Sequence, residues 1–165
     1  MNDIVKSIFF LYSRSVCAVV PHKGENTANL YINYTKEAFS MKKNVIVGQS
    51  GGPTAVINAS LYGVVYEALM QKEQIGTVYG MINGIEGFLA DTIMDMNSVE
   101  QSGELELIKT TPGSFLGSCR YKLPEDLKDD VYPLLFKKFE EYSIGYFFYI
   151  GGNDSMDTVS KLSRY

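Results

Sequence analysis

The chain has 165 residues, of which 45% are hydrophobic and 21% are charged, and its formal net charge is -4. These values are ordinary for a globular domain and give no reason to expect nucleic-acid or membrane partners, which require concentrated Lys and Arg. Cys17 and Cys119 have no CxxC spacing and His22 is the one histidine, so neither a zinc site nor a disulfide framework is indicated. We therefore expect a reducing, cytoplasmic setting.

The first 40 residues differ in pattern from the rest of the chain. Two short apolar runs, residues 8–12 and 16–20, are separated by Ser13-Arg14-Ser15, and neither is long enough to span a membrane. Residues 23–40 show no sustained hydrophobic period. We predict that residues 1–40 form an extension outside the fold and that the domain occupies residues 41–165.

Two segments have the pattern of a strand that runs through glycines into a helix. The first has Val45-Ile46-Val47 as a buried strand, a turn over residues 49–53, and a helix that begins at Pro53 with Gly52 as its cap. Its expected buried face comprises Ile57, Leu61, Val64, Val65 and Ala68. The second has residues 146–150 as the strand, glycines at 151 and 152, and a helix that begins near Ser155 or Met156.

The segment between these two units is harder to assign. Residues 77–79 read as a second strand, and Asn83-Gly84 reads as a turn. For residues 85–108 we expect loops with one short helix. A later helix is predicted to begin with Asp130 as its cap, because Pro133 then falls in the first turn and costs no hydrogen bond. Its expected buried face comprises Val131, Leu134, Leu135, Phe139 and Tyr142.

The order of strands and helices predicts an α/β fold with a mostly parallel sheet. Ligands of such sheets bind at the carboxyl ends of the strands, where free backbone NH groups and helix dipoles favour anions. Residues 50–52 and 151–152 each follow a strand directly, so both glycine loops should open on one edge. A loop rich in glycine and hydroxyl groups, residues 110–120, ends in Arg120, a side chain suited to phosphate. Together these loops predict a polyphosphate ligand.

Three motifs in the same order resemble successive motifs of the 6-phosphofructokinases. They are residues 47–53 (VGQSGGP) followed by Asn58-Ala59, residues 113–120 (GSFLGSCR), and residues 150–155 (IGGNDS). The resemblance implies a three-layer, Rossmann-like, doubly wound sheet, here an incomplete N-terminal domain that binds the phosphoryl donor. It also implies transfer to the 1-hydroxyl of fructose 6-phosphate, with Mg²⁺, from pyrophosphate or ATP, in a homo-oligomer.

The resemblance also implies roles for individual residues. The Gly51 backbone contacts the donor phosphates and Arg120 neutralises them, and the remaining donor-site residues are Gly152, Asn153, Asp154 and Ser155. Members that use ATP have Gly-Gly-Asp-Gly-Ser in the last motif, whereas this chain has Asn153 as the possible magnesium ligand and Asp154 in the place of the second glycine.

Asp154 adds bulk and negative charge where an α-phosphate of ATP lies, and two unit charges at ~4 Å repel by about 4 kcal/mol at an effective dielectric constant of 20. The pyrophosphate-dependent subgroup carries Asp at this place. We therefore assign Asp154 a catalytic role in donor selection and transition-state support, with pyrophosphate as the donor.

Other readings stay open at this point. The chain could be part of an ATP-dependent 6-phosphofructokinase, or a non-catalytic domain that binds phosphate. Asp154 could cap the following helix, and Arg120 could be a solvated surface residue. The general base of the family lies in a Thr-Ile-Asp-Asn-Asp type segment that does not occur up to Tyr165, so we expect the 165 residues to be inactive alone.

Overall fold

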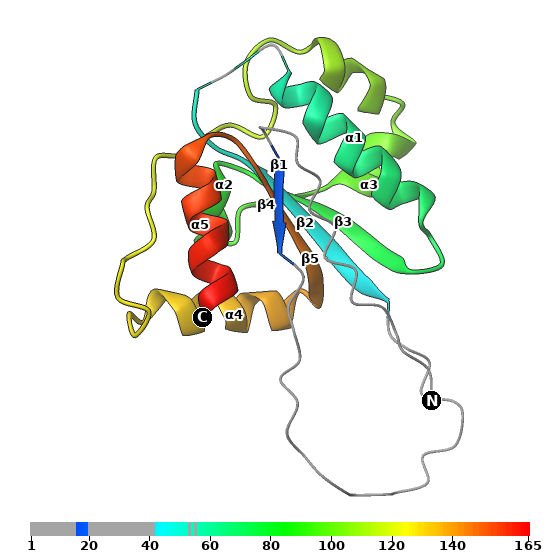
Figure 1. The fold of residues 1–165 in the computed structure, drawn as a ribbon. Coiled ribbons are helices and arrows are strands. Elements are labelled where there is room, and N and C mark those ends of the chain that lie inside the picture. The colour runs from blue at the N-terminus through cyan, green and yellow to red at the C-terminus, as the bar shows by residue number, and fades with distance from the viewer. Residues whose placement is uncertain (1–15, 20–41, 53, 55) are drawn as a thin grey trace, which may run out of the picture.

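The computed structural model describes residues 16–19, 42–52, 54 and 56–165, and within them one five-stranded sheet (Figure 1). The strands lie in the order β1-β5-β2-β3-β4. Their bounds are β1 Val16–Val19, β2 Lys43–Gln49, β3 Ile75–Met81, β4 Ile93–Asp95 and β5 Ile144–Ile150.

The three central strands are parallel and the two outer strands are not. β2 pairs in parallel with both β3 and β5, whereas β1 pairs antiparallel with β5 and β4 pairs antiparallel with β3. Parallel neighbours in one sheet need a crossover connection, and helices supply it here. The predicted α/β fold is therefore confirmed. Of the sheet that was predicted to be mostly parallel, the three central strands are parallel and an antiparallel strand lies at each edge.

Helices cover both faces of the sheet, which gives the three layers that the sequence predicted (Figure 1). One face carries α1, α3 and the 3₁₀ helix η1, and the other carries α2, α4 and α5. Their bounds are α1 Ile57–Met70, α2 Gly84–Leu89, α3 Met96–Gln101, η1 Leu105–Thr110, α4 Val131–Glu141 and α5 Asn153–Arg164.

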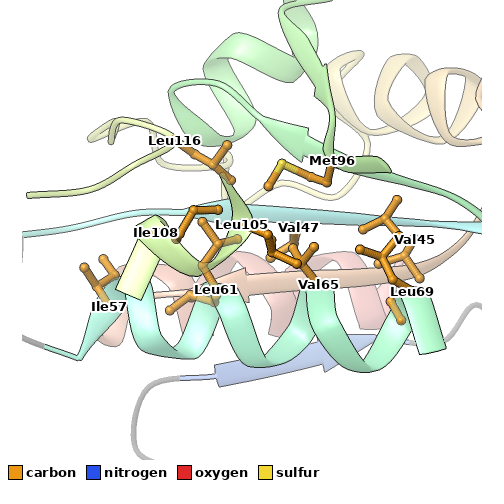
Figure 2. Packing of buried hydrophobic residues seen from close by; sticks show 13 residues of the cluster. Val45, Val47, Ile57, Leu61, Val65, Leu69, Met96, Leu105, Ile108 and Leu116 are labelled. Carbon is orange, nitrogen blue, oxygen red and sulfur yellow. The ribbon is translucent and has the colours of Figure 1, made fainter. Parts of the chain in front are cut away.

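Successive side chains of β2 point to opposite faces of the sheet, and this divides the core into two clusters. Val45 and Val47 point to α1, where Leu61 and Val65 meet them, and η1 closes this cluster (Figure 2). Ile46 points to the opposite face and packs in the cluster formed with α2, α4 and α5. Because successive side chains of a strand point to opposite faces, a strand buried on both sides reads as the continuous apolar run seen at residues 45–47.

Two helix starts differ from the predictions: that of α1, and that of α5, which begins at Asn153 and not near Ser155 or Met156. α1 begins at Ile57 with Val56 as its N-cap, so the prediction that it begins at Pro53 with Gly52 as cap is wrong. The chain first makes a turn, in which the Thr54 carbonyl accepts a hydrogen bond from the Ile57 NH at 3.3 Å. α4 begins at Val131 after Asp130, as predicted, although Asp130 makes no side-chain capping bond.

The segment 85–108 is more ordered than predicted. It contains most of α2, the strand β4, helix α3 and the start of η1. Each element has six residues or fewer, so none extends far enough to show a helical or strand period in the sequence.

Part of the extension contributes to the sheet. We expected residues 1–40 to lie outside the fold, and the structure places Val16–Val19 as the edge strand β1. Residues 1–15 and 20–41, including His22, lie outside the described residues, so the boundary at Met41 stays a prediction. Among the helices that the structure describes, none has the length and apolar character needed to span a membrane.

Candidate phosphate-binding site

Two glycine loops meet at the carboxyl ends of β2 and β5. Gln49 lies opposite Ile150 in the parallel register, and the Ser50 NH donates to the Ile150 carbonyl at 2.9 Å. A Cβ atom added to Gly51 would lie 3.9 Å from the Gly152 nitrogen, so the backbones of the loops 50–52 and 151–152 are adjacent. The prediction that both loops open on one edge of the sheet is confirmed.

Gly151 is needed for this close approach. A Cβ atom added there would lie 2.1 Å from the Ser155 Oγ and 2.4 Å from the Ser50 carbonyl oxygen. Gly51 has a φ of +88°, a conformation that side-chain-bearing residues rarely adopt. The two positions therefore require glycine for different reasons, one steric and one conformational.

The second glycine loop ends at the N-terminus of α5. Gly152 is the N-cap and supplies no side-chain capping bond, and Asn153 and Asp154 occupy the first turn with exposed side chains. Asp154 therefore does not cap the helix, so that reading is wrong. A helix N-terminus carries partial positive charge and unpaired NH groups, which makes it a binding site for anions.

Ser155 is the one buried residue of this first turn. Its side chain is 1% exposed, and its Oγ has no hydrogen-bond partner in the structure. Because a buried hydroxyl normally has a partner, the Ser155 Oγ can serve a ligand at the helix N-terminus or bind a water molecule. Ser155 is thus available for the donor-site role that the sequence predicted.

The loop of residues 110–120 joins the same edge from the other side. The Ser118 Oγ donates to the Gly51 carbonyl at 2.7 Å, and the Asn83 NH, which follows β3, donates to the Leu116 carbonyl at 2.8 Å. This loop therefore spans the ends of β2 and β3. Within the described residues Arg120 is exposed and makes no ion pair, so its guanidinium is free to reach an anion.

A buried contact fixes the backbone just before Arg120. The Cys119 Sγ lies 3.4 Å from the Tyr149 hydroxyl, and the Ile85 NH donates to the same hydroxyl at 3.4 Å. Burial raises the pKa of Tyr149 above its usual range, so the hydroxyl stays protonated at neutral pH. The contact packs closely against Gly84, where an added Cβ would lie 2.5 Å from the Tyr149 oxygen.

Lys122 is a site residue that the sequence analysis missed. Its Nζ lies 3.1 Å from the Asp154 Oδ1, and both side chains are more than half exposed, at 67% and 60%. An exposed pair of this kind contributes little to stability, but it brings a second cation to the start of α5. No local pattern marks Lys122, because its partner is 32 positions away in the chain.

Few protein groups here could bind a metal ion. Among the described residues there is no group of three His, Cys, Asp or Glu side chains placed to hold one. The donor set at the site is the Asn153 amide and the Asp154 carboxylate, which Lys122 already contacts. Such a small set of protein ligands fits a Mg²⁺ ion that is bound chiefly by phosphate oxygens and water. Proteins commonly bind Mg²⁺ in this way together with nucleotides and phosphates.

Comparison with known proteins gives consistent matches. The family model described as Phosphofructokinase matches residues 44–165. A pyrophosphate--fructose 6-phosphate 1-phosphotransferase of Methylococcus capsulatus is 44% identical over 124 residues, which cover 74% of this chain and 29% of that protein. The chain therefore spans less than a third of the length of this relative.

A solved structure and a more distant relative complete the comparison. The pyrophosphate-dependent phosphofructokinase of Nitrosospira multiformis is 42% identical with a TM-score of 0.66, covering 74% of this chain and 30% of that one. An ATP-dependent 6-phosphofructokinase of Buchnera aphidicola is 28% identical over 124 residues, covering 75% of this chain and 36% of that protein. Similarity is thus higher to the proteins named for pyrophosphate.

Proposed function

Because the chain belongs to the phosphofructokinase family, we propose that it carries the donor-binding part of an enzyme that uses pyrophosphate. The reaction is transfer of a phosphoryl group to the 1-hydroxyl of fructose 6-phosphate, which gives fructose 1,6-bisphosphate and phosphate reversibly. Four relatives with 40 to 44% identity bear the name of this activity. They support pyrophosphate as the donor.

The observation that carries the proposal is the carboxylate of Asp154 in the first turn of α5. A helix N-terminus beside two glycine loops suits the phosphate groups of either donor. A side chain at position 154 leaves less space beyond those groups than the glycine of ATP-using members. Its charge repels a further phosphate by about 1 to 4 kcal/mol at ~4 Å, depending on solvent screening, and Lys122 offsets part of this charge.

Each remaining donor-site residue receives a role in the proposal. The backbones of Gly51 and Gly152 approach the pyrophosphate, the Ser155 hydroxyl and the α5 NH groups bind its oxygens, and Arg120 neutralises its charge. Asn153 would serve as a protein ligand of Mg²⁺, and the ion would add to the charge neutralisation. Phosphoryl transfer depends on positioning and on such charge compensation more than on covalent chemistry by the protein.

The proposal is tested by exchanging residues 44–165 into the Methylococcus capsulatus relative in place of its matched segment. We expect the chimera to use pyrophosphate in preference to ATP, and Asp154→Gly to reduce that preference at least tenfold. Ser160→Gly, at an exposed position of the same helix, controls for the cost of a glycine in α5. Unchanged donor preference in Asp154→Gly would remove the explanation given for Asp154.

The same chimera separates the two other candidate functions. An ATP-dependent enzyme predicts turnover with ATP before any substitution is made. A non-catalytic phosphate-binding domain predicts that pyrophosphate binds but that no fructose 1,6-bisphosphate forms. The family also implies a homo-oligomer, which sedimentation of the chimera would detect.

A further inference from the structure

Two buried side-chain amides lie between the end of β2 and the start of α1. Gln49 is 0% exposed and Asn58 is 3% exposed. The Gln49 Nε2 donates to the Asn58 Oδ1 at 2.9 Å and to the Ile57 carbonyl at 3.2 Å. A buried amide costs stability unless its groups are hydrogen-bonded, so the arrangement of this pair is closely determined.

The amide pair, Gln49 and Asn58, binds the backbone of the loop 111–116 at four points. The Asn58 Nδ2 donates to the carbonyls of Thr111 at 2.7 Å and Gly113 at 2.8 Å. The Phe115 NH donates to the Asn58 Oδ1 at 3.0 Å. The Leu116 NH donates to the Gln49 Oε1 at 2.8 Å. With these bonds Asn58 uses both of its donor hydrogens and both acceptor positions of its oxygen.

The held segment leads directly into the candidate site. Two residues after Leu116, the Ser118 Oγ donates to the Gly51 carbonyl, and Arg120 follows two residues later. The loop 111–116 has no strand ladder of its own, and Gly113 has a φ of +76°. Besides the backbone bond from the Asn83 NH to the Leu116 carbonyl, its position relative to the loop 50–52 therefore depends on side-chain bonds, four of which come from the amide pair.

We infer that Gln49 and Asn58 are positioning residues that set the distance between the first glycine loop and the loop carrying Arg120, so that one pyrophosphate meets both. This inference rests on the proposed function, because it concerns how the same donor site is held. Neither side chain touches the donor. Their effect on binding acts through the backbone of residues 111–116.

A third amide, which lies in β2 as Gln49 does, offers a matched control. Asn44, near the opposite end of β2, donates through Nδ2 to the Tyr142 carbonyl at 2.7 Å and accepts from the Thr77 NH at 2.7 Å. Like Asn58, it therefore bonds both a backbone carbonyl and a backbone NH. It lies at the amino end of the strand, away from the glycine loops, so it serves the fold alone.

The experiment is a titration of the chain with inorganic pyrophosphate, followed by ³¹P NMR, for wild type, Asn58→Asp and Asn44→Asp. Each substitution removes the amide donor and keeps an acceptor oxygen. We expect Asn58→Asp to weaken binding about tenfold or more, and Asn44→Asp to change it less than twofold. Urea unfolding of each variant shows how much stability was lost. An equal loss of binding in both variants would mean a structural role only and would overturn the inference.

Failure of the inference can be told from failure of the proposed function. If wild type binds no pyrophosphate, the proposed function fails for this chain and the positioning role fails with it. If wild type binds and Asn58→Asp binds equally well, only the positioning role fails.

If Asn58→Asp does not fold, amide hydrogen exchange of the wild-type chain tests the inference instead. The amide hydrogens of Phe115 and Leu116 should exchange as slowly as those of β2. Exchange as fast as in exposed loops would contradict the inference.

Discussion

Gly151 and Gly152 follow one another in the chain but have different surroundings. A Cβ atom on Gly151 would meet the Ser155 Oγ at 2.1 Å and the Ser50 carbonyl at 2.4 Å, whereas a Cβ on Gly152 meets nothing within 4 Å. The φ of Gly152, -95°, is one that residues with side chains adopt, and its ψ of -148° lies outside the helical and strand regions. Packing therefore explains the first glycine but not the second, for which we propose the close approach of a ligand.

Alanine at each position should separate stability from binding. Gly151→Ala forces the two loops apart, so we expect a loss of about 1 to 3 kcal/mol in the free energy of unfolding. Gly152→Ala should change stability by less than about 0.5 kcal/mol, because the added methyl group meets no atom within 4 Å, and yet weaken pyrophosphate binding. Urea unfolding followed by circular dichroism, together with the pyrophosphate titration, measures both. A Gly151→Ala variant as stable as wild type would contradict this reading of the loop.

Residue-level prediction from the sequence succeeded where the signal is local. A strand, two glycines and a helix start lie within a few positions, so the convergence of the glycine loops could be predicted before the structure. The roles of the amide pair and of Lys122 could not be predicted, because each depends on contacts with residues more than 30 positions away in the chain. Asn58 offered one hint, because a polar side chain directly after Ile57 on the buried face of α1 needs a hydrogen-bond partner.

At the scale of single elements, the buried face of α4 agrees with the prediction except at one position. Leu134 was predicted to be buried but is 46% exposed, while Tyr132 is 0% exposed. The Tyr132 hydroxyl donates to the Pro124 carbonyl at 2.5 Å, and its ring stacks on Tyr165. Leu135 and Phe139 are buried as predicted, so among the apolar residues the difference is Tyr132 in place of Leu134. That exchange depends on tertiary partners, which the helical pattern does not contain.

One ion pair joins α4 to the turn after α2. The Lys138 Nζ lies 2.5 Å from the Asp91 Oδ1, with Lys138 9% exposed and Asp91 56% exposed, and the Tyr142 hydroxyl donates to the same oxygen at 3.3 Å. The hydrogen bond from Lys138 lowers the pKa of the Asp91 carboxyl below its usual value, against the opposing effect of burial. Asp91 also has a φ of +57°, which Asn tolerates as well as Asp.

Asp91→Asn should therefore be destabilising in a way that depends on pH. Because the pKa is lower in the folded state, the ionised carboxylate stabilises the fold above the unfolded pKa of about 4. That contribution disappears as the pH falls through the folded pKa. We expect the variant to unfold at lower urea than wild type at pH 7 and the difference to shrink towards pH 2.5.

A second ion pair provides the control for this prediction. Glu141→Gln removes an exposed pair with Lys137 at 3.6 Å and should have little effect at any pH. If the difference in unfolding urea concentration between Asp91→Asn and wild type stays constant from pH 7 to pH 2.5, the charge of Asp91 is not the cause of the destabilisation.

At the scale of the whole molecule, the three layers follow from the order of elements, but the edges of the sheet do not. Buried parallel strands leave continuous apolar runs such as residues 45–47, which made the centre predictable. β4 has three residues and β1 has four, and both pair antiparallel at an edge. Strands this short leave no period in the sequence, so only the pairing in three dimensions identifies them.

β1 covers a strand that would otherwise form an edge of the sheet. It pairs along Phe147 to Ile150 of β5, and on its other side β5 pairs with β2. β5 has seven residues and includes the aromatic run at residues 146–149. An uncovered strand of this length and composition presents unpaired backbone groups to other chains, which promotes edge-to-edge association.

Removal of residues 1–41 should therefore cause self-association, whereas removal of residues 1–15, which keeps β1, should not. Both core clusters are built from residues that follow position 41, so the shorter chain retains the packing that stabilises its sheet. Sedimentation velocity over a range of concentrations measures the association, and amide exchange in β5 reports whether its outer edge has opened. If both truncated chains sediment as wild type does and β5 stays protected in each, β1 is not what covers this edge, and residues 1–40 lie outside the fold as the sequence first indicated.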